Sequence, residues 1–179
     1  LESATDRGIL VINCPGKNTN SAAELTIGLL LGMFRNIPQA QQHLKNGGWD
    51  RHTFTGLELR NKTIALIGLG NVGHRVAKFC RGLDMKVLAF DPYIAPDLFC
   101  RHEVEPVETL LQAASQCDIL SVHVPLNHET RGMIDSDILK HMKPGSFVIN
   151  AARGGIINEN DLLESLQSGH ISKAAIDTF

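Results

Sequence analysis

The chain has 179 residues, 43% of them hydrophobic and 20% charged, and a formal net charge of −2. This length suits one domain with a sizeable core, and the near-neutral charge gives no indication of a nucleic-acid or membrane-surface partner. No apolar run is long enough to cross a bilayer, and the four cysteines lack the spacing of a metal site or a disulfide framework, which favours reduced thiols, no metal and a cytoplasmic protein.

The N-terminal part of the chain contains a predicted strand and two predicted helices. "LVINCP", residues 10–15, predicts a strand with no obvious partner in the chain. "NSAAELTIGLLLGMF", residues 20–34, predicts a helix because Ser21 and Glu24 have the spacing of a capping box and the rest is apolar nearly all round. Such a helix must be buried on more than one side, within its own domain or against a second subunit, and its periodicity fits both. Pro38 predicts the start of the second helix.

From Thr63 onward, short apolar runs alternate with helical patterns, as in a parallel sheet built from strand and helix units. The strands are predicted at 63–67, 86–90, near Val104, and at 118–124, 147–150 and 171–176. Between the strands, apolar residues fall on single helical faces. One such helix is predicted over 159–168, because Asn158 can cap its start, with Asp161 three residues later, and Gly169 can end it. The pattern predicts an α/β, Rossmann-type, doubly wound parallel sheet of six strands with helices on both faces.

A glycine pattern, G-x-G-x-x-G, follows the strand predicted at 63–67. Gly68, Gly70 and Gly73 would permit a tight turn, close approach of the backbone to a pyrophosphate, and packing of helix on strand. Asp91, eighteen residues after Gly73, ends the second strand, where a carboxylate binds ribose hydroxyls. A like charge at ~4 Å costs roughly 4 kcal/mol at an intermediate dielectric, so Asp91 favours NAD over NADP. The alternative is a glycine-rich turn and a solvated carboxylate with no ligand.

The other predicted strands end in residues that would lie at the same edge of the sheet. Ligands of open α/β sheets bind beyond the carboxyl ends of the strands. The residues at these ends are Val124 and Pro125, then Ala151, Ala152 and Arg153, and finally Asp177. The sequence therefore predicts one crevice with Arg153 pointing into a cofactor site, and the alternative is an arginine that merely neutralises a strand end.

Three segments carry a resemblance to a known family. "GLGNVG" with Asp91, "SVHVPLNHETRGMI" and "INAARGGIINENDLLESLQSGHISKAAID" resemble the NAD-binding domain of the D-isomer-specific 2-hydroxyacid dehydrogenases over essentially the whole chain. The resemblance implies an NAD-dependent oxidoreductase that acts on a 2-hydroxy or 2-oxo acid. It implies that Arg153 is catalytic, binding the substrate carboxylate and polarising the oxygen at C2.

The resemblance also implies positions for the cofactor and the substrate. The pyrophosphate would contact the glycines together with Asn71 and Val72, and the ribose would contact Asp91. Val124 and Pro125 would flank the cofactor. The nicotinamide side would contact Ala151, Ala152 and Arg153, and its carboxamide would contact Asp177. Asn18 would reach the substrate. Two departures from the family pattern are Lys173, where a small residue is usual, and Thr178, where Val is common.

The family pattern extends past both ends of the chain. Residues 1–17 would be a remnant of a substrate domain, with "LVINCP" as its last strand, and 18–179 the NAD-binding domain, so the N-terminus at Leu1 is not expected to be native. The catalytic glutamate and histidine of the family are expected beyond Phe179. Within the chain, His74 and His123 are more often structural than proton donors in such positions.

Two functions of different classes fit these features. The first is the cofactor domain of an NAD-dependent 2-hydroxyacid dehydrogenase, and the alternative is a non-catalytic NAD(H)-sensing module of the transcriptional-corepressor kind. The apolar helix, over residues 22–35, further predicts a homodimer, because apolar surface of that size is rarely left in water.

Overall fold

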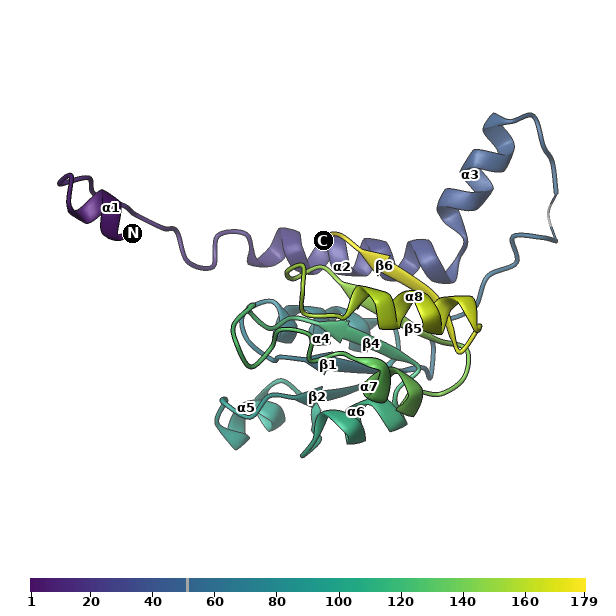
Figure 1. Ribbon diagram of the computed structural model, residues 1–179. Coiled ribbons are helices and arrows are strands. Elements are labelled where there is room, and N and C mark those ends of the chain that lie inside the picture. The colour runs from purple at the N-terminus through teal and green to yellow at the C-terminus, as the bar shows by residue number, and fades with distance from the viewer. Residues whose placement is uncertain (51) are drawn as a thin grey trace.

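The centre of the molecule is a sheet of buried apolar strands that runs parallel throughout. The computed structural model describes residues 1–50 and 52–179, and its sheet has the order β3-β2-β1-β4-β5-β6 with parallel pairing at every step. Helices cover both faces of this sheet (Figure 1). The strand order reverses between β1 and β4, which is the switch point of a doubly wound fold. The predicted Rossmann-type architecture is confirmed.

The strands follow the apolar runs of the sequence closely. Their bounds are β1 Thr63–Ile67, β2 Lys86–Phe90, β3 Glu105–Pro106, β4 Ile119–Val122, β5 Ser146–Asn150 and β6 Ile171–Ile176. The bounds of β1, β2 and β6 are as predicted, whereas the third strand lies one residue past Val104 and β4 is shorter than the predicted 118–124. The fourth strand ends early because its neighbours end in the same register, at Ile67 and Asn150.

The helices form two layers around the sheet. Their bounds are α1 Glu2–Thr5, α2 Thr19–Phe34, α3 Ile37–Lys45, α4 Gly73–Gly82, α5 Pro96–Arg101, α6 Leu110–Gln116, α7 Ser136–His141 and α8 Glu159–Gln167. One buried apolar cluster joins α2, α4 and α5 to one face, and a second joins α6, α7 and α8 to the other. Among the described residues, no helix combines the length and the apolar character that crossing a membrane requires.

The apolar helix α2 packs on its own sheet along one side. Leu30 and Phe34 are fully buried, and the ring of Phe34 lies 4.4 Å, centre to centre, from that of Phe147 on β5. The helix begins at Thr19, before the predicted start, and the predicted capping box is wrong, because the Ser21 hydroxyl donates to the Asn18 carbonyl instead. Burial within the domain thus accounts for one side of this helix.

Polar side chains join α2 and α8 to their neighbours. Lys173, a departure from the family pattern, donates from β6 to the Met33 carbonyl at 3.1 Å and to the Asn36 side chain, which ties down the end of α2. Asn158 caps α8 as predicted by accepting from the Asn160 and Asp161 amides. The Asp161 carboxylate accepts from the Ser136 amide and so links α8 to α7.

The predicted strand at 10–15 is absent from the structure. This segment is extended, with Leu10 and Ile12 exposed by 81% and 75%, and α1 stands away from the body (Figure 1). A strand needs a neighbouring strand to pair with its backbone N–H and C=O groups. Among the described residues, neither edge strand of the sheet, β3 or β6, pairs with residues 10–15. The prediction of a strand from the apolar stretch alone was therefore wrong.

Candidate functional site

The parallel register brings five strand ends into one row. Ile67 is paired with Phe90 and with Val122, and the row continues through Asn150 to Ile176. The residue after each of these lies at the same edge of the sheet, and these residues are Gly68, Asp91, His123, Ala151 and Asp177. A turn glycine, two carboxylates and an imidazole, from strands that are far apart in sequence, therefore lie together at the carboxyl end of the sheet.

The three glycines of the loop from β1 into α4 have different surroundings. Gly68 has φ +98°, and a Cβ there would lie 3.0 Å from a methyl group of Val124. A Cβ on Gly73 would collide with the Gly68 carbonyl oxygen, whereas a Cβ on Gly70 would meet nothing within 4 Å. No side chain caps α4. The loop is therefore closed against its own strand and open at Gly70, in front of a helix N-terminus that favours an anion.

Asp91 braces this loop from the end of β2. Its Oδ2 accepts from the Leu69 amide at 2.8 Å, and its Oδ1 accepts from the Tyr93 amide at 3.0 Å. Each carboxylate oxygen can accept a further hydrogen bond. The carboxylate is thus fixed beside the glycine loop with capacity left for ribose hydroxyls.

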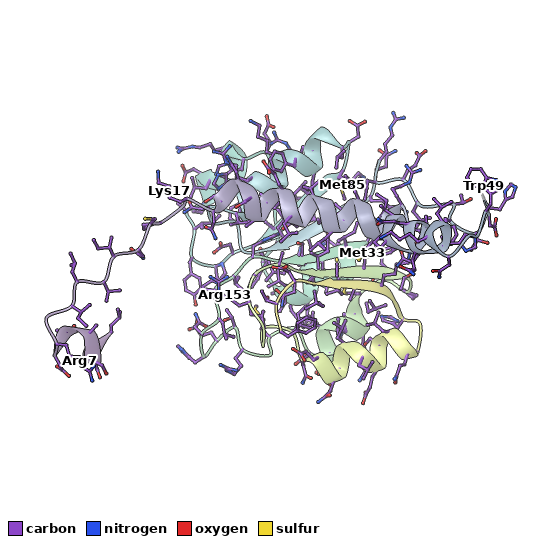
Figure 2. All side chains as sticks on the ribbon, turned by 90° about the horizontal axis from the view of Figure 1, so that it is seen from above. Arg7, Lys17, Met33, Trp49, Met85 and Arg153 are labelled. Atoms are coloured by element: carbon purple, nitrogen blue, oxygen red, sulfur yellow. The ribbon has the colours of Figure 1, made fainter. Side chains whose placement is uncertain are left out.

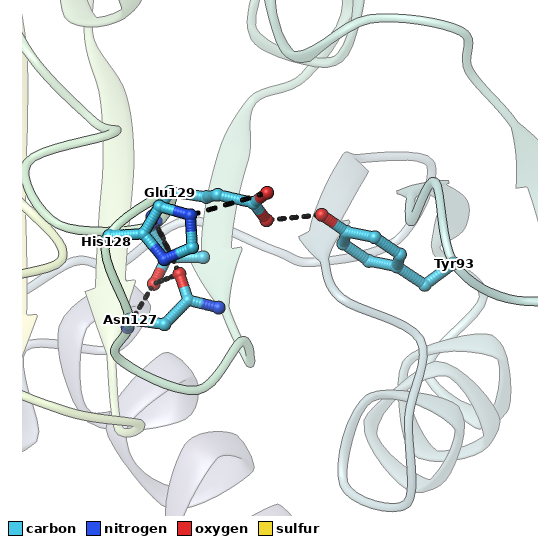
Figure 3. A network of polar contacts seen from close by, with 5 residues as sticks. Tyr93, Asn127, His128 and Glu129 are labelled. Atoms are coloured by element: carbon cyan, nitrogen blue, oxygen red, sulfur yellow. Dashed lines mark hydrogen bonds and ion pairs between the residues drawn. The ribbon is translucent and has the colours of Figure 1, made fainter.

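A second bridge connects the loops after β2 and β4. The Tyr93 hydroxyl donates to the Glu129 carboxylate, and this hydrogen bond raises the pKa of Tyr93 (Figure 3). Asn127 shapes its loop, because its Oδ1 accepts from the amides of Glu129 and Thr130, both at 2.9 Å. The Thr130 hydroxyl then donates to the Pro125 carbonyl at 2.6 Å, so this network also fixes Pro125.

Arg153 sits on a turn that a buried asparagine holds. Asn150 is 2% exposed; its Nδ2 donates to the Arg153 carbonyl at 2.8 Å, and its Oδ1 accepts from the Ala152 amide at 3.1 Å. A Cβ on Gly154 would collide with the backbone of Phe179. The Arg153 side chain is exposed, and Figure 2 shows it at the same end of the body as Lys17. Sequence reasoning missed Asn150, although a polar residue closing the run "FVIN" was a usable signal.

These loops enclose a crevice of about 540 Å³. Nine of the predicted site residues line it: Asn18, Asn71, Val72, Val124, Pro125, Ala151, Ala152, Arg153 and Asp177. Gly68, Gly70, Gly73 and Asp91 do not line it but build and brace the adjoining loop. The site prediction did not include five further lining residues, Ser21, Ala22, Leu25, His123 and Thr178. The first three come from α2, whose apolar pattern carries no signal of a crevice.

His123 forms part of the crevice wall as a neutral group. Burial lowers its pKa from 6.5 to about 4, and its Nε2 lies 3.0 Å from the Ser121 hydroxyl. An imidazole with this pKa is uncharged at neutral pH. The structural role expected of His123 stays a prediction.

The crevice and the glycine loop beside it fit a dinucleotide. The space in front of Gly70, the uncapped α4 and the paired Asp91 carboxylate suit pyrophosphate and ribose. Among the described residues, the buried Thr178 hydroxyl in the crevice has no hydrogen-bond partner, as expected of a group that meets a polar ligand. The fold and the site together define a dinucleotide-binding domain of the dehydrogenase type.

Comparison with known proteins identifies the family of dehydrogenases to which the chain belongs. The chain belongs to the D-isomer specific 2-hydroxyacid dehydrogenase family, whose NAD binding domain matches residues 27–179. It is 45% identical to D-3-phosphoglycerate dehydrogenase of Archaeoglobus fulgidus and 42% identical to that of Methanocaldococcus jannaschii, with all of this chain covered and 34% of each relative. The chain therefore spans about a third of the length of these relatives.

A solved dehydrogenase structure has the same fold at lower sequence identity. The apo-structure of D-lactate dehydrogenase from Escherichia coli superposes with a TM-score of 0.92 at 28% identity, covering 99% of this chain and 55% of that one. The sequence motifs "NCPGKNTNSAAEL" and "RNIPQA" also look most like D-3-phosphoglycerate dehydrogenase, in agreement with the curated relatives. The predicted family and the predicted cofactor NAD are confirmed.

Two glycine variants should separate packing from cofactor binding. Gly73→Ala should destabilise the domain, because its Cβ meets a backbone oxygen that cannot move without the loop. Gly70→Ala should leave the urea midpoint nearly unchanged and weaken NADH binding by about tenfold or more, because the Cβ enters the space proposed for the pyrophosphate. Urea unfolding and calorimetric NADH titration measure the two effects. Equal NADH affinity in Gly70→Ala and the unchanged chain would contradict this assignment.

The depressed pKa of His123 predicts a pH dependence of stability. The folded state resists protonation and the unfolded state does not, so the contribution of His123 is complete above the unfolded pKa of 6.5 and is lost as pH falls toward about 4. The loss is at most ~3 kcal/mol by proton linkage. Urea unfolding from pH 7 to 4 should show a shallower loss in His123→Gln. Identical slopes in the two proteins, or an NMR titration of His123 near 6.5, would contradict the assignment.

Proposed function

We propose that this chain is the cofactor half of an NAD-dependent dehydrogenase that interconverts a D-2-hydroxy acid and its 2-oxo acid. The observation that carries the proposal is the position of Arg153, whose guanidinium is the permanent cation that lines the crevice in the described part of the chain. A planar guanidinium pairs with a carboxylate through two parallel hydrogen bonds. The dehydrogenase names of the relatives support an enzyme over a sensing module.

The residues of the crevice and of the adjoining loop each have a role in this proposal. Asn71 and Val72 line the side of the pyrophosphate, Asp91 accepts from the ribose hydroxyls, and Val124 and Pro125 flank the cofactor. When bound, NAD supplies the site that accepts or returns a hydride. Ala151 and Ala152 leave room beside Arg153 for the nicotinamide side, and Asp177 faces its carboxamide.

The substrate contacts within the chain are proposed at Arg153 and Asn18. Both residues line the crevice, and Asn18 immediately precedes α2. We assign residues 1–17 to a substrate domain and 18–179 to the NAD-binding domain, with the general acid supplied from outside the chain. The phosphoglycerate dehydrogenases among the relatives support a phosphorylated three-carbon acid as the substrate. The free thiols of all four cysteines support a cytoplasmic protein.

Cofactor preference should depend on Asp91. NADH should bind at least ~10-fold more tightly than NADPH, because a 2′-phosphate would lie against this carboxylate. Asp91→Ala should narrow the difference by weakening NADH, which loses its ribose acceptor, and by relieving repulsion of NADPH. Asp137→Ala removes an exposed carboxylate from α7 and serves as the control. Equal calorimetric affinities of the unchanged chain for both cofactors would count against the proposal.

Arg153 should act on the acid and not on the cofactor. In the full-length protein, Arg153→Ala should lower kcat/KM for the 2-oxo acid by about a hundredfold or more while NADH affinity stays nearly constant. Arg131→Ala removes a neighbouring arginine that is absent from the crevice lining, and it should leave kcat/KM within about twofold. Retained activity with lost NADH binding in Arg153→Ala would refute the role.

We further propose that the chain forms a homodimer through residues 22–35, which comprise most of α2 and the residue after it, together with the adjoining α3. Leu25, Ile37, Leu44 and Trp49 are exposed by 42%, 53%, 54% and 79%, and α3 projects from the body (Figure 1). Large apolar side chains left exposed favour a protein partner over water. The segment therefore suits a second copy.

Sedimentation velocity tests the dimer. The unchanged chain should sediment as a dimer at micromolar concentration, and Ile37→Asp with Leu44→Asp should give a monomer, because two charges would be buried at the interface. Leu111→Asp introduces a charge at a comparably exposed position, 44%, on α6 and should leave the dimer intact. A monomeric unchanged chain would refute the proposal.

A further inference from the structure

A small hollow on the outer side of α4 is lined by cationic and imidazole side chains. It has a volume of about 150 Å³, and within the described part of the chain its lining is His74, Arg75, Lys78, Arg81, Arg101 and His102. His74, Lys78 and Arg81 have the spacing that places residues on one helical face. Arg101 and His102 close the hollow from the end of α5. The cofactor crevice shares no lining residue with it.

The hollow carries an excess of positive charge that nearby acids only partly offset. Arg81 pairs with Glu103 and donates to the His102 carbonyl, which holds α5 against α4. Arg101 pairs with Asp97 at 3.4 Å. The two carboxylates are 71% and 65% exposed, and ion pairs this exposed are weak. Arg75 and Lys78 have no acidic partner among the described residues, so two cations remain uncompensated in a chain whose net charge is −2.

The two imidazoles of the hollow are packed together and held in place. Their rings stack with centres 4.7 Å apart and planes 16° from parallel. The Nδ1 of His74 lies 2.8 Å from the Gly70 carbonyl and donates to it, which leaves Nε2 free. Burial lowers the pKa of His102, and the positive charges of His74, Arg101 and Arg81 lower it further. An anion bound in the hollow would offset the positive charges and so raise the pKa of His102.

We propose that this basic hollow binds a phosphate group with two or more negative charges, either as a free inorganic ion or as the terminal group of a small phosphoester. The guanidinium of Arg75 and the ammonium of Lys78 are free to donate, and arginine forks match phosphate oxygens. The small volume suits a phosphate group. The site is separate from the dinucleotide crevice and does not depend on the function proposed for it.

Inorganic pyrophosphate and inorganic phosphate are the probes, each titrated into the chain at low ionic strength by calorimetry and by NMR of the imidazole protons. Pyrophosphate should bind saturably, shift the His102 resonances and raise the His102 pKa. A sugar phosphate titrated alongside distinguishes an ester source from the free ion. Sodium chloride at equal ionic strength controls for general screening.

Matched variants locate the bound ion. Arg75→Gln with Lys78→Gln should weaken pyrophosphate binding by about tenfold or more, because it removes the two unpaired cations. Lys140→Gln with Lys45→Gln removes two cations on α7 and α3 and should change the affinity by less than about twofold. Equal weakening in both double variants, or no saturable binding, would overturn the proposal. Complete loss of pyrophosphate binding under saturating NADH would also overturn it, because the ion would then occupy the cofactor crevice.

Discussion

The site depends on the register of the parallel sheet. Because Ile67, Phe90, Val122, Asn150 and Ile176 stand in one row, the residues that follow them must meet at one edge. Direct hydrogen bonds then join these residues to the row: the Gly68 amide donates to the Phe90 carbonyl at 2.9 Å and the His123 amide to the Ile67 carbonyl at 2.8 Å. A slip of one residue in any strand would turn its apolar side chains toward the wrong face and displace its contribution to the crevice. The register of the strands therefore determines both the packing of the core and the geometry of the site.

Much of this arrangement could be predicted because buried parallel strands and glycine turns have local signatures. The apolar runs that form β1, β2 and β6 fixed their bounds to the residue, and the glycine spacing located the loop before α4. The residues that sequence reasoning missed act through distant partners. Asn150 looks like the end of a strand until its side chain is seen to hold the Arg153 turn, and Leu25 looks like core until it lines the crevice.

The failed predictions have the same cause. The apolar stretch at 10–15 satisfies the pattern of a strand, but pairing requires a neighbour that the described chain does not place there. Ser21 and Glu24 have the spacing of a capping box, but the helix begins at Thr19, so Ser21 already lies within the first turn. Local pattern predicts which conformations a segment can adopt, and tertiary contacts decide which of them it does adopt.

The charges around the glycine loop are divided between its two sides. On the sheet side, Asp91 accepts from the Leu69 amide, and Glu129 reaches the Tyr93 hydroxyl nearby, so this side is acidic. On the outer side, His74 donates to the Gly70 carbonyl and adjoins Arg75 and Lys78, so this side is basic. Hydroxyl groups, which donate hydrogen bonds, are favoured on the acidic side, and anions are favoured on the basic side. The loop itself carries no charged side chain, and it is held from both sides at adjacent residues, by Asp91 at the Leu69 amide and by His74 at the Gly70 carbonyl.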